Sequence, residues 1–125
     1  MDAKRDAPAA GELVKWETQL RKGGLSLAVL ATLWEGRLYG LEILRRLESR
    51  AGLAVPEGTI YPLLSRLKAD GLVASEWEEA EAGHPRKYYS LTDAGRGRLC
   101  EMAQAWKAFA RGLGRLLAPL DGDRP

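Results

Sequence analysis

Hydrophobic residues recur every three to four positions along most of the chain, which is the spacing of helices that bury one face. A first helical pattern begins at Glu12, and Gly23 and Gly24 are expected to weaken or break it because glycine is a poor helix former. The segment LSLAVLATLWEG then reads as a mostly buried helix. A further amphipathic pattern begins at Leu41 and predicts a core helix that ends at Gly52.

A third core helix is predicted after Pro56. Its apolar residues fall at positions i, i+3, i+4 and i+7, the spacing of an amphipathic helix: Ile60, Leu63, Leu64 and Leu67. Pro62 complicates the start of this helix, because proline inside a helix loses a hydrogen bond and clashes with the carbonyl four residues before it. Thr59 is therefore predicted as the N-cap, which would place Pro62 in the first turn, where no donor is lost.

After Gly71 the period changes from 3.6 to 2, which predicts strands in the runs LVASEW and RKYYSL. The turn between them, EEAEAGHP, contains glycine and proline and is longer than a tight hairpin loop. Thr92 is predicted to cap a final helix, with Asp93 in its favourable first turn. Helix, strand, turn and strand in this order are typical of a winged helix, so the predicted fold class is mainly α with a small β-hairpin wing.

The final helix carries a heptad seam, because apolar residues recur along it at alternating spacings of three and four. The seam consists of Leu99, Met102, Trp106, Phe109, Leu113, Leu116 and Leu120. A monomer could cover such a seam by folding it back on the core. A long apolar stripe in a small chain more often packs on a partner helix, so the N-terminal and C-terminal helices are predicted to form the interface of a homodimer.

These patterns divide the chain into four parts. Residues 1–10 are charged, rich in alanine and proline and without periodicity, and are predicted to be a disordered tail. Residues 11–91 form a winged helix-turn-helix domain with an N-terminal helix. Residues 92–118 form the C-terminal dimerisation helix, and residues 119–125 form a second tail.

Composition narrows the choice of function class. The net charge of +2 and the pI near 8.8 permit a nucleic-acid partner if the basic residues cluster, but do not require one. The only cysteine, Cys100, cannot form an intrachain disulfide, and neither a secretion signal nor a membrane span is recognisable, so a cytoplasmic protein is expected. One histidine and one cysteine far apart form no catalytic or metal-binding set, so neither an enzyme nor a cofactor is predicted.

Two motifs give the sequence a family resemblance. The pieces GTIYPLLSRL and PRKYYSLTDAG, in this order and with this gap, resemble the PadR family of bacterial transcription regulators. The resemblance runs from about Leu20 to Arg98 and more loosely to Leu117. It implies a winged helix-turn-helix domain, a single C-terminal dimerisation helix and a repressor of the short subclass. It also implies that a small molecule releases the DNA in some members.

The candidate DNA-binding residues lie on the third helix, in the wing and in the link before the second helix. Hydroxyl groups can bond base edges or phosphates, and Arg and Lys bind phosphate. The set is Tyr39, Thr59, Tyr61, Ser65, Lys68, His84, Arg86 and Lys87. Glu76, Glu78, Glu79 and Glu81 would repel DNA if they faced it, so they are expected on the far strand and turn. A charged hairpin tip that only keeps an edge soluble remains the alternative.

A candidate effector site lies on the seam. Counting from the YYSLT motif, Trp106 matches a tryptophan that lines a flat-ligand pocket in multidrug-sensing members of the family. The tentative ligand-binding set is Leu13, Trp16, Met102, Trp106 and Phe109, suited to a small flat aromatic compound. Plain dimer core is the alternative for Trp106, and Trp34 and Trp77 are interpreted as structural. Two other functions stay open: a constitutive regulator without an effector, and a winged-helix protein-interaction module that binds no DNA.

Overall fold

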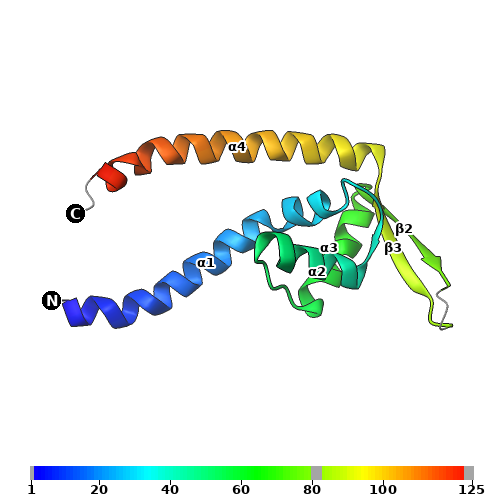
Figure 1. Cartoon of the computed structure of the whole chain (residues 1–125), viewed down its shortest axis with the longest axis horizontal. Coiled ribbons are helices and arrows are strands. Elements are labelled where there is room, and N and C mark those ends of the chain that lie inside the picture. The colour runs from blue at the N-terminus through cyan, green and yellow to red at the C-terminus, as the bar shows by residue number, and fades with distance from the viewer. Residues whose placement is uncertain (1, 80–82, 123–125) are drawn as a thin grey trace.

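The described part of the chain folds into four helices and a small sheet (Figure 1). The computed structural model describes the backbone of residues 2–79 and 83–122 and the side chains of residues 11–79 and 83–122. The elements in chain order are α1 (Asp2–Thr32), β1 (Leu38–Tyr39), α2 (Gly40–Ala51), α3 (Glu57–Ala69), β2 (Val73–Glu78), β3 (Arg86–Leu91) and α4 (Asp93–Gly122). The predicted fold class, mainly α with a β-hairpin wing, is confirmed.

Helix α1 is longer than the sequence pattern predicts. It runs without a break from Asp2 to Thr32, so the predicted disordered tail over residues 2–10 and the predicted break at Gly23-Gly24 are both wrong. Each glycine costs only about 1 kcal/mol relative to alanine, which two positions in a 31-residue helix can absorb. Residues 1–10 are rich in alanine, the strongest helix former. Because they show no hydrophobic period, the sequence pattern did not reveal this helix propensity.

The hydrophobic core lies where the second half of α1 meets α2, α3 and the sheet. Its buried side chains come from every element: Val29, Leu30, Leu33, Leu38, Ile43, Leu47, Ile60, Leu63, Leu64, Leu67, Leu72, Val73, Tyr89 and Leu99. All four residues of the predicted apolar face of α3 are among them. The opposite face of α3 therefore remains free for another partner.

Helix α3 begins three residues earlier than predicted. Pro56 occupies the N-cap position, and its carbonyl accepts hydrogen bonds from the N–H groups of Thr59 and Ile60 at 3.0 and 3.1 Å. Thr59 is thus a helical residue and not the N-cap, and Pro62 lies inside the helix. The helix tolerates Pro62 because only one hydrogen bond, to the carbonyl of Gly58 in the first turn, is lost.

The sheet contains one strand that the sequence pattern did not show. Its order is β1-β3-β2 with antiparallel neighbours, and β1 is the short segment Leu38–Tyr39 that was predicted to be a link. Tyr39 lies opposite Tyr88, and on the other side of β3, Glu76 lies opposite Tyr88 and Glu78 opposite Arg86. We call β2, β3 and their connection, residues 73–91, the wing.

Helix α4 is fixed to the core at its first turn. The Thr92 hydroxyl accepts a hydrogen bond from the Gly95 N–H at 2.9 Å, which confirms Thr92 as the cap, and donates one to the Gly71 carbonyl at 2.6 Å. A Cβ on Gly95 would lie 1.9 Å from the Leu72 carbonyl oxygen, so only glycine permits this close approach. The start of α4 is therefore tied to the turn between α3 and the wing.

Beyond the core, α1 and α4 extend to the side of the molecule opposite the wing, and both chain ends lie there (Figure 1). We call residues 11–22 of α1 and 103–122 of α4 the two arms. Their large apolar side chains are exposed: Leu13, Val14, Trp16, Leu20, Trp106, Phe109, Leu113, Leu116, Leu117 and Leu120. No helix among the described residues is both long and apolar enough to cross a membrane.

Candidate nucleic-acid interface

An open cleft of about 470 Å³ separates the outer face of α3 from the wing. Its lining consists of Tyr39, Gly40, Tyr61, Ser65, Trp77, Pro85, Arg86, Lys87 and Tyr89. The cleft thus brings together five of the eight candidate DNA-binding residues, from β1, α3 and β3. This convergence follows from the fold, because the outer face of α3 and the start of β3 border the same space.

Tyr61 is held in the cleft by a close contact with α2. A Cβ on Gly40 would lie 2.5 Å from the ring and hydroxyl of Tyr61, so a larger residue there would displace the end of the Tyr61 side chain. Burial raises the pKa of the Tyr61 hydroxyl, and the neighbouring Glu57 carboxylate raises it further. Tyr61 therefore stays protonated at neutral pH and can donate a hydrogen bond to phosphate or to a base edge.

The two cations at the start of β3 lie over aromatic rings. The Arg86 guanidinium is 4.5 Å from the centre of the Tyr39 ring. The Lys87 ammonium is 5.7 Å from the centre of the Trp77 ring and 5.9 Å from that of Tyr89. Such contacts are worth about 0.5–1 kcal/mol at exposed sites, enough to orient a cation without preventing a phosphate contact.

Three of the predicted residues lie outside the cleft. Thr59 is exposed near the start of α3, where it lines a groove beside Arg21 and Lys22 of α1. Lys68 is exposed at the other end of α3, and His84 is exposed just before β3. All three remain accessible to a ligand, but the single chain does not gather them at one point.

The acidic residues of the wing are paired with a cation that sequence reasoning missed. Arg37 Nη1 lies 3.1 Å from Glu76 Oε1 and also forms an ion pair with Glu78 Oε2. The hydrogen bond and the attraction between Arg37 and Glu78 raise the pKa of Arg37 and lower that of Glu78. Glu76 and Glu78 lie on the edge strand β2, and Glu79 is exposed after it, while Glu81 lies outside the described residues.

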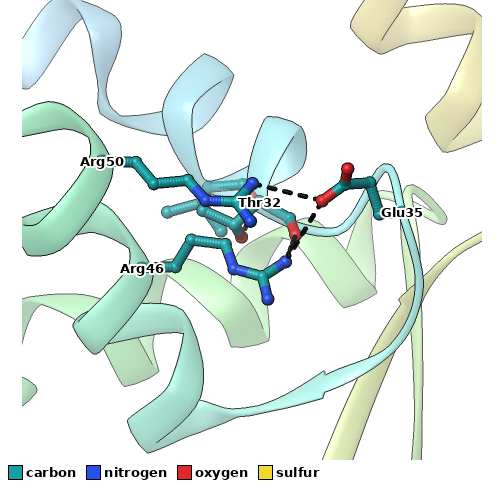
Figure 2. A network of polar contacts seen from close by, with 5 residues as sticks. Thr32, Glu35, Arg46 and Arg50 are labelled. Atoms are coloured by element: carbon teal, nitrogen blue, oxygen red, sulfur yellow. Dashed lines mark hydrogen bonds and ion pairs between the residues drawn. The ribbon is translucent and has the colours of Figure 1, made fainter.

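A second polar network fixes the end of α1 against α2 (Figure 2). Glu35 Oε1 pairs with Arg50 at 3.2 Å and with Arg46 at 3.7 Å, and Arg46 also donates to the Thr32 carbonyl at 3.4 Å. On α4, the Arg96 guanidinium lies 4.8 Å over the Trp34 ring. The turn after α1 is thus joined to α2 and α4, which sets the position of the helix-turn-helix relative to the arms.

Trp77, Gly40 and Arg37 are functional candidates that the sequence analysis did not include. Trp77 was interpreted as structural, but it is 66% exposed and lines the cleft. Its alternation with Val73 and Ser75 on β2 and its position opposite Lys87 were the available signal. Gly40 and Arg37 carried no sequence signal, because their roles depend on contacts with distant parts of the chain.

The candidate effector residues do not enclose a site within one chain. Met102 packs partly against the core, whereas Leu13, Trp16, Trp106 and Phe109 are exposed on the arms. Leu99 was predicted at the dimer interface, but it is buried in the core of its own chain, so the free part of the seam begins at Trp106. Among the described residues, no group of three or more His, Cys, Asp or Glu side chains could hold a metal ion.

Comparisons with known proteins agree with this architecture. A family model described as the transcriptional regulator PadR-like family matches residues 29–101. A transcriptional regulator of Mycobacterium tuberculosis is 36% identical over 93 residues, which cover 74% of this chain and 85% of the relative. The relatives that we name here are described as transcriptional regulators or factors and none as an enzyme.

Solved structures show the same fold. A PadR family regulator from Eggerthella lenta is 38% identical and superimposes with a TM-score of 0.77 over 89% of this chain and 97% of the other. A PadR-like transcription factor from Bacteroides fragilis is 39% identical, with a TM-score of 0.69 over 82% and 98%. With a family model over more than half of its length and these structural relatives, the chain belongs to the PadR-like family of transcriptional regulators.

Proposed function

We propose that the protein is a sequence-specific DNA-binding repressor that binds an inverted-repeat operator as a homodimer. The observation that carries this proposal is the cleft, in which two cations of the wing and the polar face of α3 border one open space. Membership of a family of transcriptional regulators supports the same reading.

Helix α3 is the recognition helix in this proposal. In helix-turn-helix proteins the second helix lies in the major groove and reads base edges with residues near its N-terminus. Thr59 and Tyr61 are exposed on the first half of α3 and Ser65 just beyond its middle, and all three would reach the bases or the adjoining phosphates. The wing would then lie along the neighbouring backbone, where Arg86 and Lys87 contact phosphates and fix the register.

The homodimer is supported by the arms. Each arm exposes large apolar side chains in a row, and two of those on α4, Phe109 and Leu116, are 67% and 78% exposed. Solvent-exposed rows of this kind are characteristic of interaction surfaces. A second copy related by a two-fold axis offers the same rows and would cover them, and it would place a second recognition helix at a fixed distance.

An effector site on the dimer axis is a second element of the proposal. Trp106 and Phe109 are exposed on one arm and Trp16 on the other, so a dimer would gather several aromatic rings. A flat aromatic compound could stack there, and it would release the DNA only if it prefers a different spacing of the recognition helices. A filled, ligand-free interface would instead give a constitutive regulator.

The test of DNA binding is fluorescence anisotropy with a labelled duplex taken from upstream of the protein's own gene. We expect binding that is tighter than to an unrelated duplex of equal length and that weakens steeply with salt, because phosphate contacts release counterions. A winged-helix protein-interaction module would bind neither duplex. Equal affinity for both duplexes would support DNA binding but contradict an operator.

A further inference from the structure

The wing places a carboxylate beside one of its two phosphate-binding candidates. Glu78 on β2 lies directly opposite Arg86 on β3, and side chains in directly opposite positions of antiparallel strands have Cβ atoms only about 4.5–5.5 Å apart. An ion pair between them would occupy the guanidinium that the proposed function assigns to phosphate. Among the residues that the structure describes, however, Arg86 forms no ion pair, and its guanidinium lies over the Tyr39 ring.

Two carboxylates of the wing form ion pairs with Arg37 instead. Arg37 enters from the turn before β1 and pairs with both Glu76 and Glu78, which protrude from the same face of β2. Its guanidinium also lies 4.4 Å from the centre of the Tyr88 ring. Tyr88 in turn contacts the edge of Tyr39, with ring centres 5.6 Å apart. On one face of the sheet, Arg37 thus lies over the Tyr88 ring and Arg86 lies over the Tyr39 ring.

The ion pairs themselves contribute little to folding. The side chains of Arg37, Glu76 and Glu78 are 41%, 70% and 48% exposed, and exposed pairs of this kind have little effect on stability. Their importance is electrostatic, because two negative charges on the wing would otherwise face a polyanion. The single positive charge of Arg37 offsets one of these two negative charges beside Arg86, which changes the charge that the wing presents without adding a DNA contact.

We propose that Arg37 is a positioning residue that binds Glu76 and Glu78 and thereby keeps Arg86 free to contact a DNA phosphate. The inference rests on the proposed DNA-binding function and adds a residue outside the recognition helix and the wing. Arg37 acts through Arg86 and does not itself contact the DNA. Removing Arg37 therefore releases Glu78, which captures Arg86 and withdraws one phosphate contact.

Salt titrations of duplex binding test the functional half of this inference. We expect Arg37→Ala to weaken binding and to reduce the slope of log K against log salt by about 0.9, the value for one phosphate contact. The double variant Arg37→Ala with Glu78→Gln should regain the wild-type slope, because glutamine cannot form an ion pair with Arg86. Lys15→Ala, which removes one charge from an arm far from the wing, should leave the slope unchanged and serves as the matched control.

Two outcomes of the titrations would overturn the proposal. If Arg37→Ala with Glu78→Gln keeps the reduced slope, then Arg37 contacts the DNA itself. The same conclusion follows if Arg37→Ala lowers the slope as much in an Arg86→Ala background as in the wild type, because a residue that acts through Arg86 has no effect once Arg86 is gone.

An NMR titration of the Glu78 carboxyl group tests the structural half without DNA. In the wild type, the Arg37 hydrogen bond lowers the pKa of Glu78. We expect the pKa of Glu78 to remain low in Arg37→Ala, where Arg86 replaces Arg37, and to return to its ordinary value only when both arginines are removed. An ordinary pKa of Glu78 in Arg37→Ala alone would overturn the proposal. A wild-type protein that binds no duplex would instead contradict the proposed function, and this titration would still decide the role of Arg37.

Discussion

At the scale of single residues, the wing uses two adjacent cations in different ways. Arg86 and Lys87 follow each other on β3, so their side chains leave opposite faces of the sheet. Arg86 lies over Tyr39 on the face that also carries Arg37 and Tyr88, while Lys87 lies near Trp77 and Tyr89 on the face toward α3. Two neighbouring phosphates could therefore be contacted from one strand end.

Removing both cations should weaken DNA binding without changing its sequence preference. We expect Arg86→Ala with Lys87→Ala to reduce the slope of log K against log salt by about 1.8, because about 0.9 is lost for each phosphate contact. The affinities for operator and unrelated duplex should fall together, since phosphate contacts carry no sequence information. Anisotropy titrations at several salt concentrations give both values. An unchanged slope would show that the wing does not reach the DNA.

Substitutions on α3 should change the sequence preference of DNA binding and leave its salt dependence unchanged. Thr59→Ala and Tyr61→Phe remove single hydroxyl groups and leave the net charge unchanged. If these hydroxyl groups reach base edges, the ratio of operator to unrelated-duplex affinity should fall while the salt slope is retained. The same pair of titrations measures both. A ratio that stays at the wild-type value in both variants would exclude these hydroxyl groups from base recognition.

At the scale of elements, the first turn of α4 joins the arm to the turn between α3 and the wing. Thr92 makes this joint through two hydrogen bonds of its hydroxyl group, one to the helix that it caps and one to the Gly71 carbonyl. Gly71 lies in the left-handed region with φ of +78°, which favours glycine there. The direction of α4 is thus tied to the end of α3.

Loss of the Thr92 cap should destabilise the fold. Replacing an N-cap threonine by alanine costs about 1–2 kcal/mol, so Thr92→Ala should lower the melting temperature by several degrees. Thr18→Ala is the matched control, because the Thr18 hydroxyl donates to the Val14 carbonyl of its own helix at 2.9 Å and caps no helix. Thermal unfolding followed by circular dichroism compares the two at equal protein concentration. Equal melting temperatures for Thr92→Ala and the wild type would contradict the structural role of the cap.

The elements with a strong local signal were predicted from the sequence. The apolar face of α3, the two strands of the wing and the Thr92 cap were all found, because a change of period and a capping residue are local properties. Strand β1 was missed because two residues cannot show a period, and Leu38 and Tyr39 become a strand only by pairing with β3. The continuity of α1 was missed because two adjacent glycines look like a helix break in the sequence. Their cost to the folding free energy is small enough for the helix to continue through them.

Residues of the candidate site could be predicted from the sequence only where they lie in one of the two recognisable motifs. Tyr61, Ser65, Arg86 and Lys87 line one cleft, as the order of α3 and wing implies, while their contact with DNA stays a prediction. Arg37 lies 39 positions before Glu76, so their ion pair depends on the sheet order and register. The close contact between Gly40 and Tyr61 similarly depends on how α2 crosses α3.

At the scale of the whole molecule, the wing and the ends of the two arms lie on opposite sides of the core (Figure 1). The turn after α1 connects α1 to α2 through Glu35, and to α4 through Trp34, which lies under Arg96. In the proposed dimer, a change in how the arms pack would therefore reach α2 through the Glu35 ion pairs. This arrangement suits regulation by a ligand bound between the arms.

The proposed effector site makes Trp106 the residue to change. We expect a planar cationic dye to bind the dimer and Trp106→Ala to bind it at least about tenfold more weakly, because stacking on tryptophan is lost. Trp34→Phe, at a tryptophan outside the arms, should bind the dye as the wild type does. Dye fluorescence titrations with and without operator measure the coupling, which must be equal in both directions. Unchanged dye affinity in a dimeric Trp106→Ala protein would remove Trp106 from the site.

Hydroxyl-radical footprinting of the protein on the DNA upstream of its own gene tests the central claim most directly. A homodimer with two recognition helices should protect two symmetric half-sites, with centres about 34–36 Å apart or a multiple of that distance, on one face of the duplex. Substituting arginine for Leu113 and Leu116, which are exposed on the α4 arm, should abolish the paired pattern together with the dimer. A single, asymmetric protected segment with the wild-type protein would contradict the account.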